Sequence, residues 1–344
     1  MSDRVISVDR TWSFRRFILQ WEWMLVLIFI AVNIVGSSLS PYYLNGGTFL
    51  TAPMGFLDVA FLVLPMTFVM ILGSIDISVG STAALSAVVM AVSFHAGLPM
   101  WLAVIVCLAV ATACGLLNGI LMVAFKELSS VIITLATMII YRGIAYIILR
   151  DQASGEFPKW YSGVGWGYVA GIPIITLAFV VCAIIFGLVL HATSFGRKVY
   201  GMGNNLTASR YSGIRTDSVV VIVFTVTGLM AGITALFLTS RMGSTRPNVA
   251  LGYELTAIAM TVLGGVSTAG GKGRIIGPVL AVFIIGFLNY GLGLVNIPSQ
   301  VLLIITGLLL VLSVLVLNIR FSRGHQHSAP TASAPAAARK TPNG

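Results

Sequence analysis

The sequence predicts an all-α membrane protein that crosses the bilayer about ten times. Of its 344 residues, 58% are hydrophobic and only 9% are charged, whereas a soluble domain carries about 25% charged residues. The apolar residues also stand in continuous runs of membrane-spanning length rather than in the alternating patterns of soluble elements. These two observations exclude a single large soluble core.

The apolar runs give the expected helices in chain order. At about 1.5 Å per residue, each run crosses most or all of a hydrocarbon core about 30 Å thick. The first run is too long for the apolar part of a signal peptide and no cleavage site follows it, so we expect a spanning helix there. The expected helices are 23–39, 53–73, 79–95, 99–124, 130–149, 171–191, 218–239, 252–268, 275–295 and 299–319.

The same pattern divides the chain into three segments. We expect a cytoplasmic N-terminal segment at 1–22 and one transmembrane domain at 23–319, with a cytoplasmic loop at 192–217. Residues 320–344 are rich in Ala, Pro and Ser and contain no apolar run, so they are expected to form a disordered cytoplasmic tail.

The distribution of Lys and Arg predicts how the chain is oriented. With the N-terminus in the cytoplasm, fifteen of the 20 basic residues fall in cytoplasmic segments and one, Arg142, falls inside a helix. The outer segments hold the remaining four, which are Arg150, Lys159, Arg241 and Arg246. Because cytoplasmic loops carry the excess of Lys and Arg, we expect both termini to face the cytoplasm.

The sequence contains no catalytic or metal-binding pattern. Its three cysteines lie in apolar runs without CxxC spacing, and its four histidines form no protease or metal motif. The Gly-rich stretch 264–273 is no P-loop, because Val266 stands where a Walker A loop needs glycine and Gly273 replaces the hydroxyl that holds magnesium. We therefore expect no enzyme, no cofactor or metal on this chain and, despite the net charge of +10, no nucleic-acid partner.

Two charged residues at membrane depth are candidates for a transport path. Asp58 lies in the outer part of the second expected helix, and Arg142 lies at a similar depth in the fifth. Such groups are costly in a bilayer and so indicate function. One hypothesis is that they pair or that both line a polar cavity. The alternative, that Arg142 snorkels outward and Asp58 sits among the headgroups, is equally open.

A third acid stands in a break of the apolar sequence. Asp76 lies in the segment 73–81, where glycines and serines interrupt the apolar residues. Irregular backbone at membrane depth must be buried in protein or line a watery path. We favour this buried, structured interpretation over a simple loop at the inner interface. Ser78 and Asn289 complete the set of candidate path residues.

The loop 192–217 contains a predicted surface helix of about two turns. Leu206 to Ser212 follow a possible N-cap at Asn204 or Asn205, and a glycine follows as the stop. So short a helix needs a docking partner, and with a single charged residue it suits a protein better than a lipid surface. The candidate contact residues are Gly203, Asn204, Asn205, Ala208, Ser209 and Gly213.

Glycine spacing predicts close helix packing. Gly115–Gly119 and Gly228–Gly232 are GxxxG pairs, which let helix backbones approach one another. Together with Gly286, Gly291 and Gly293 they indicate a tightly packed bundle.

Four separated segments between residues 55 and 318 resemble the permease subunits of carbohydrate-type ABC importers, the group of ribose, xylose, rhamnose and autoinducer-2 permeases. The segment around Asp76 is similar to a glycine–isoleucine–aspartate–serine–valine–glycine signature, with Ser74 where glycine is usual. The other segments resemble the fifth-helix pattern, the ATPase-coupling loop and a late Gly-rich signature. In order, the four segments are 73–81, 134–145, 195–214 and 255–273.

The resemblance implies a ten-helix importer fold of the vitamin B12 permease type in a bacterial inner membrane. Implied partners are ABC ATPase subunits, which hold ATP and magnesium, a second permease chain of the same or a related kind, and a periplasmic solute-binding protein. The implied function is import of a sugar or sugar-like solute. A stand-alone secondary transporter or facilitator is the alternative, disfavoured because the bilayer midplane is almost empty of coupling charges.

Overall fold

The computed structural model describes residues 21–301, apart from 46 and 299, and isolated positions between 304 and 315. The expected cytoplasmic segment at 1–22 lies outside this range except for its last two residues, and the expected tail at 320–344 lies outside it entirely. Most of the expected last helix, 299–319, also lies outside the described residues.

The described part of the chain contains an apolar helix at each of the first nine predicted positions. Six are long and apolar enough to cross a membrane. Three are shorter, and these lie at the predicted runs 53–73, 79–95 and 252–268. The nine helices are α2 (Trp21–Leu39), α4 (Leu57–Ile71), α5 (Val79–His95), α6 (Met100–Ala124), α7 (Ser130–Leu149), α9 (Ile174–Ala192), α12 (Thr216–Met242), α13 (Tyr253–Leu263) and α14 (Ile276–Leu294).

Two of the shorter helices, α4 and α13, are shorter at both ends than the apolar runs that predicted them. A 3-10 turn, η1 (Ala52–Gly55), precedes α4, because the chain departs from helical geometry at Phe56. The helix α13 begins after Gly252 and ends before Gly265, both of which have positive φ angles that glycine adopts without strain. Hydropathy alone does not predict where a helix begins or ends when that point lies inside an apolar run.

Small elements connect the helices. The segment between α7 and α9 forms one helix, α8 (Lys159–Trp166), and three two-residue strands. β1 (Ser154–Gly155) pairs antiparallel with β4 (Ser244–Thr245), and β2 (Tyr168–Val169) pairs antiparallel with β3 (Ile172–Pro173). Apart from these pairs, and the short helices α3 (Thr48–Thr51), α10 (Ser194–Asn204) and α11 (Leu206–Tyr211), the described fold is the predicted array of apolar helices.

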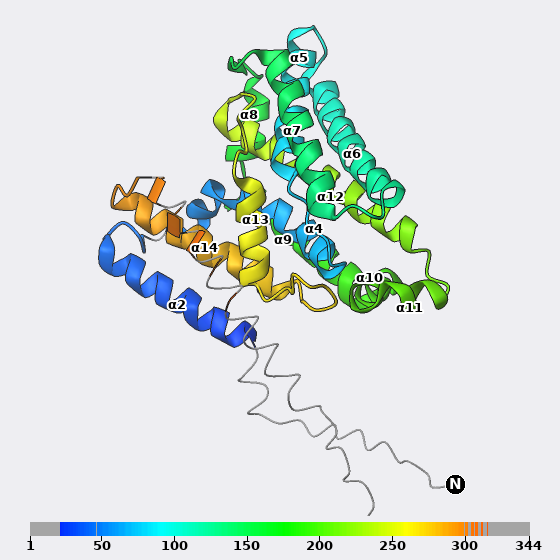
Figure 1. Ribbon diagram of the computed structural model, residues 1–344. Helices are drawn as coiled ribbons and strands as arrows, with labels where there is room; N and C mark the ends of the chain where they lie inside the picture. Colours follow the sequence, from blue (N-terminus) through cyan, green and yellow to red (C-terminus); the bar gives the residue numbers. More distant parts are fainter. Residues whose placement is uncertain are drawn as a thin grey trace, which may run out of the picture.

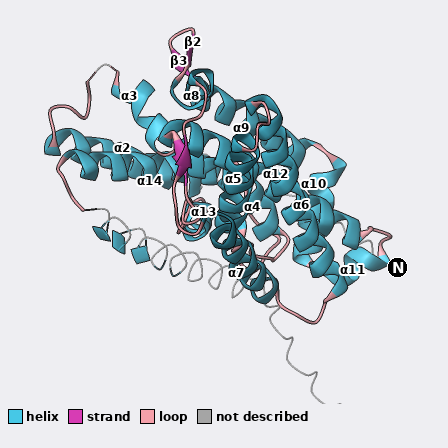
Figure 2. Ribbon diagram, turned by 90° about the horizontal axis from the view of Figure 1, so that it is seen from above, coloured by secondary structure: helices cyan, strands magenta, loops and turns pink. Residues whose placement is uncertain are grey.

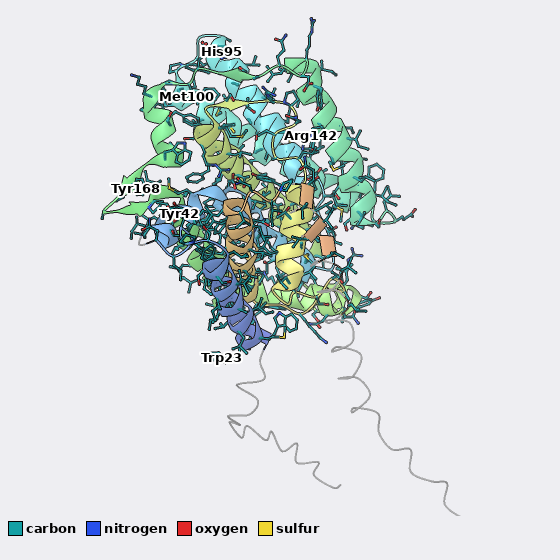
Figure 3. The ribbon with its side chains drawn as sticks, turned by 90° about the vertical axis from the view of Figure 1, so that its left-hand side faces the viewer. Trp23, Tyr42, His95, Met100, Arg142 and Tyr168 are labelled. Carbon is teal, nitrogen blue, oxygen red and sulfur yellow. The ribbon has the colours of Figure 1, made fainter. Side chains whose placement is uncertain are left out.

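The helices form two flanks around a central helix. Figure 1 shows α2 and α14 side by side on one flank and α5, α6 and α7 on the other. All fifteen residues of α4 are buried, because this helix packs against α9, α12, α13 and α14 (Figure 2). His95 and Trp23 lie at opposite ends of the bundle, with Arg142 nearer the His95 end (Figure 3).

The two GxxxG segments pack against each other, in keeping with the tight packing that these spacings predicted. A Cβ atom added at Gly115 lies 2.8 Å from the Cα of Gly228, and one at Gly119 lies 2.9 Å from the Cα of Val221. The α6 and α12 backbones are therefore in direct contact, as small residues allow in membranes. Gly286 and Gly291 likewise abut the rings of Phe56 and Tyr43. At Gly293, by contrast, a Cβ meets nothing within 4 Å.

Candidate functional site

Asp58 forms a buried ion pair in the first turn of α4. Its carboxylate Oδ2 lies 2.5 Å from Nη2 of Arg241 and accepts a hydrogen bond of 3.1 Å from the hydroxyl of Tyr253. A second guanidinium nitrogen of Arg241 donates to the carbonyl of Met54 at 2.8 Å. The cluster ties together η1, α4, α12 and α13.

The predicted pair between Asp58 and Arg142 is therefore wrong. The sequence-based topology placed Arg241 in an outer loop, but α12 continues to Met242 and brings this guanidinium down onto Asp58. The alternative for Asp58, a position among headgroups, also fails, because only 1% of this residue is exposed.

Arg142 binds the backbone of the loop that joins α12 to α13. One nitrogen, Nη1, donates to the carbonyls of Pro247 and Val249, each at 2.7 Å. Nε donates to the hydroxyl of Ser81 on α5 at 3.2 Å. Arg142 thus holds the loop 243–252 against α5 and α7. Its position within an apolar run did not indicate this role.

The break between α4 and α5 is structured, and its residues Asp76 and Ser78 are buried, as the sequence favoured, whereas Gly73 is exposed. Asp76 is 2% exposed, and its Oδ1 accepts hydrogen bonds from the amide and the hydroxyl of Ser78 at 2.9 and 2.7 Å. Asn118 on α6 donates to the Ser78 hydroxyl at 2.7 Å, and Tyr141 on α7 donates to the Asn118 amide oxygen at 3.0 Å. A chain of polar contacts therefore crosses three helices.

Side chains of α7 also satisfy the backbone of this break. The hydroxyl of Ser130 accepts from the amide of Ile75 at 3.0 Å, and that of Thr134 accepts from the amide of Ile77 at 3.2 Å. Unpaired backbone groups are costly at membrane depth, and these bonds remove the cost. That Asp76 and Ser78 line a transport path stays a prediction.

Asn289 stands apart from these networks. It lies on α14, is half-buried, and its Oδ1 has no hydrogen-bond partner within the described residues. None of the contacts of Asp58, Asp76 or Arg142 given above reaches it. Its place on a transport path also stays a prediction.

The predicted surface helix is present, and a second helix precedes it. In α11 the side chain of Asn205 caps the first turn by accepting from the amide of Ala208 at 2.9 Å, and Gly213, with φ of +81°, follows its end. Asn204 instead ends α10, and its amide donates to the carbonyl of Tyr200 at 2.9 Å. The helix α10 was missed, although Thr193 supplies its N-cap.

The candidate contact residues of this helix pair divide into two groups. Gly203 and Ser209 face the chain itself: Ser209 is 6% exposed, and a Cβ at Gly203 lies 1.8 Å from the carbonyl oxygen of Ile71. The outward group, exposed to solvent, is Asn204, Asn205, Ala208 and Gly213. Sequence reasoning missed two exposed apolar residues of α11, Leu206 at 46% and Tyr211 at 90% exposure.

The late Gly-rich segment connects this helix pair to the end of α4. The amide of Gly271 donates to the carbonyl of Ile71 at 2.8 Å, and the hydroxyl of Tyr200 on α10 donates to the carbonyl of Gly273 at 2.6 Å. Gly203 fits between Ile71 and Gly271. The helices α10 and α11 are thereby joined to the end of α4 at Ile71, five residues before Asp76.

The sequence comparisons agree with this architecture. Residues 54–314 match the family model described as branched-chain amino acid transport system / permease component. The chain belongs to this permease family. It is 31% identical over 310 residues to the autoinducer 2 import system permease protein LsrD of Escherichia coli K12, covering 88% of this chain and 93% of the relative. The protein of the same name from Shigella flexneri matches equally, and no solved structure matches.

Membership of this family fixes the class of the protein. The chain is the permease component of a binding-protein-dependent ABC import system, a multi-pass transport subunit and not an enzyme. The resemblance to importer permeases is confirmed, and ATPase and binding-protein partners follow from the class.

Proposed function

We propose that this permease forms half of a translocation path for a sugar or sugar-like solute and that α11 is its contact with an ABC ATPase. The exposed, capped helix α11 carries the proposal. Its six residues are too few to be stable alone, and Tyr211 presents a large apolar side chain that is 90% exposed. Exposed aromatic residues of this kind are typical anchors of protein interfaces.

The contacts behind α11 support transmission of ATPase motion into the membrane. Only Asn205 separates the helix from α10, which packs through Gly203 on the end of α4. The helix α4 leads into the break at Asp76, where hydrogen bonds to α6 and α7 hold the irregular backbone. A shift of the docking helices therefore reaches a buried polar segment without passing through flexible side chains.

The solute class is inferred from a similar permease and from the polar side chains inside the helix bundle. The similar permease of Escherichia coli belongs to an autoinducer 2 import system. The polar groups that line up inside α5, α6 and α7 are mainly hydroxyls and amides, such as those of Ser78, Asn118 and Thr134. Groups of this kind exchange hydrogen bonds with hydroxyl-rich solutes.

The assembly follows the fold that the family resemblance implies. In this proposal ten helices of the vitamin B12 permease type cross a bacterial inner membrane, with α10, α11 and both termini on the cytoplasmic side. A second permease chain completes the path. Two partner subunits hold ATP and magnesium, and a periplasmic binding protein delivers the solute.

Reconstitution in liposomes tests the proposal. Uptake of labelled D-ribose, D-xylose, L-rhamnose, autoinducer 2 and leucine is measured with this chain alone and with the complete complex. We expect ATP-dependent uptake of at least one of the first four solutes, and only by the complete complex. Comparable flux through this chain alone identifies a facilitator, and uptake of leucine alone overturns the solute class.

A further inference from the structure

A cavity of about 260 Å³, lined by both polar and apolar residues, lies beside the loop 243–252, slightly below the usual size range of small-molecule sites. Its polar lining residues are Ser244, Thr245, Arg246, Asn248 and Tyr253. Its apolar lining residues are Leu238, Met242, Val249, Ala250 and Leu251, of which Met242 and Leu251 are exposed. The cavity therefore offers hydrogen-bonding groups on one part of its wall and an apolar surface on another.

The loop that forms this cavity is held rigidly from behind. Arg142 donates to two of its carbonyls, those of Pro247 and Val249. Its first residues pair with β1 as strand β4. A Cβ at Gly80 of α5 lies 2.6 Å from the carbonyl oxygen of Ala250, so the loop and α5 are in backbone contact. A loop anchored at three points presents its other side in a fixed geometry.

The polar groups of the cavity have unused hydrogen-bonding capacity. The hydroxyl of Thr245 is buried and has no partner within the described residues, and this residue is 1% exposed. This oxygen has almost no accessible surface, so it lies behind the cavity wall and leaves the exposed side chains to meet a ligand. Arg246 makes no ion pair in the described part of the chain, and Asn248 is exposed.

The composition of the lining selects a class of ligand. It contains no carboxylate, and its one charged group is a guanidinium. A cation is therefore disfavoured, whereas a neutral or anionic molecule with several hydroxyl groups has a hydroxyl, an amide and a guanidinium to bond. Met242 and Leu251 suit the C–H face of a sugar ring. A second cavity, between α9 and α12 and lined by apolar side chains such as Phe68, Phe186 and Phe195, lacks these groups.

We propose that the cavity beside the loop 243–252 binds the solute on the outer side of the permease, through Arg246 and Asn248. This inference rests on the proposed function and names a site for it. Tyr253 connects the site to the interior, because it lines the cavity and donates its hydroxyl to Asp58 of the buried ion pair. A solute in the cavity lies next to the cluster that joins α4, α12 and α13.

Cysteine labelling of Asn248→Cys in the complete complex tests the site. The reagents are an anionic sulfonatoethyl and a cationic trimethylammonioethyl methanethiosulfonate, and wild type measures the background of the three native cysteines. Gln152→Cys is the matched control, because residue 152 is exposed near β1 but does not line the cavity. We expect Arg246 to make the anionic reagent react faster at position 248 only.

Protection by solutes gives a readout that does not depend on transport. D-ribose, D-xylose, L-rhamnose and autoinducer 2 are each added in excess during labelling. A ligand at ten times its Kd leaves about a tenth of the sites free, so at least one solute is expected to slow labelling at position 248 about tenfold. Labelling at position 152 is expected to stay unchanged.

The outcomes separate the site from the function. Unchanged labelling at position 248 with all four solutes overturns the cavity, as does full uptake by the labelled Asn248→Cys complex. Wild-type ATP-dependent uptake of one solute shows in the same experiment that the proposed function stands. Protection at position 248 without any uptake supports solute binding in the cavity and contradicts the proposal that the permease transports that solute.

Discussion

At the scale of single residues, the buried charges illustrate what depth in a sequence predicts. Asp58 and Arg142 were expected at similar depth and as a possible pair, yet each has a different partner. Arg241 reached Asp58 because α12 extends to Met242, and Arg142 met backbone carbonyls of a loop whose path no sequence pattern reveals. Depth follows from counting along an apolar run, whereas pairing depends on how three helices rotate against one another.

The ion pair of Asp58 is expected to be essential for stability. In Asp58→Asn the guanidinium of Arg241, which is 18% exposed, loses its counter-charge. Breaking a buried pair in this way costs about 3–5 kcal/mol, so the purified complex should melt at a lower temperature. The double variant Asp58→Asn/Arg241→Gln should recover part of the loss.

An exposed ion pair supplies the control for this measurement. Asp217 contacts Lys126 and Arg210, and all three side chains are 45–48% exposed. Such pairs contribute at most about 1 kcal/mol, so Asp217→Asn should leave melting nearly unchanged. Equal melting temperatures for Asp58→Asn and Asp217→Asn contradict the assignment of a stabilising buried pair.

At the scale of elements, capping residues predicted the helix α11, whereas the glycine content of α10 kept that helix from being predicted. Asn205 and Gly213 delimited α11 in the sequence, because capping is local chemistry. The helix α10 contains three glycines, which disfavour helix by about 1 kcal/mol each. Packing explains two of them, since Gly196 and Gly203 each touch backbone that leaves no room for a Cβ.

Substitution of Gly203 should disturb the contact between α10 and α4. In Gly203→Ala the new Cβ lies 1.8 Å from the carbonyl oxygen of Ile71, so the helices must separate. Overpacking of this kind costs about 1–3 kcal/mol, and uptake should fall with stability. Gly143→Ala on α7 is the control, because its Cβ meets nothing within 4 Å and alanine favours helix. Equal behaviour of the two variants refutes the contact.

Substitutions on the outer face of α11 should act without loss of stability. Tyr211→Glu removes a side chain that contacts little within the chain and places a charge where the ATPase is proposed to dock. Losing an interface anchor worth about 2 kcal/mol weakens binding more than tenfold, so ATPase subunits should no longer copurify. Tyr42→Glu, at an exposed site outside this helix pair, is the control. Retained copurification in Tyr211→Glu contradicts the docking surface.

At the scale of the whole molecule, hydropathy predicted the number and order of the helices better than their lengths. Each of the nine described apolar helices lies on a predicted run, because continuous burial in lipid requires continuous apolar sequence. The 15-residue α4 and the 11-residue α13 are shorter than their runs. Turns end these helices inside apolar sequence, because η1 and Phe56 precede α4 and glycines flank α13. The segment 72–78, which joins α4 to α5, contains Asp76, and the segment 243–252, which joins α12 to α13, borders the proposed solute cavity.

The helix bundle has two ends, and labelling from either side of the membrane tests which end faces the cytoplasm. The helices α10 and α11 lie at the end of the bundle opposite to the connection between α5 and α6 (Figure 1). His95 stands at that connection (Figure 3), and its ring contacts the carbonyl of Gly155 in β1. We expect an impermeant maleimide to label Gln152→Cys in intact cells, and Tyr211→Cys only after permeabilisation. Labelling of Tyr211→Cys in intact cells contradicts cytoplasmic docking, since the helix that is to meet the ATPase then faces away from ATP. The two positions lie at opposite ends of one packed bundle. Labelling of Tyr211→Cys in intact cells, or of Gln152→Cys only after permeabilisation, therefore means that the whole predicted topology is reversed.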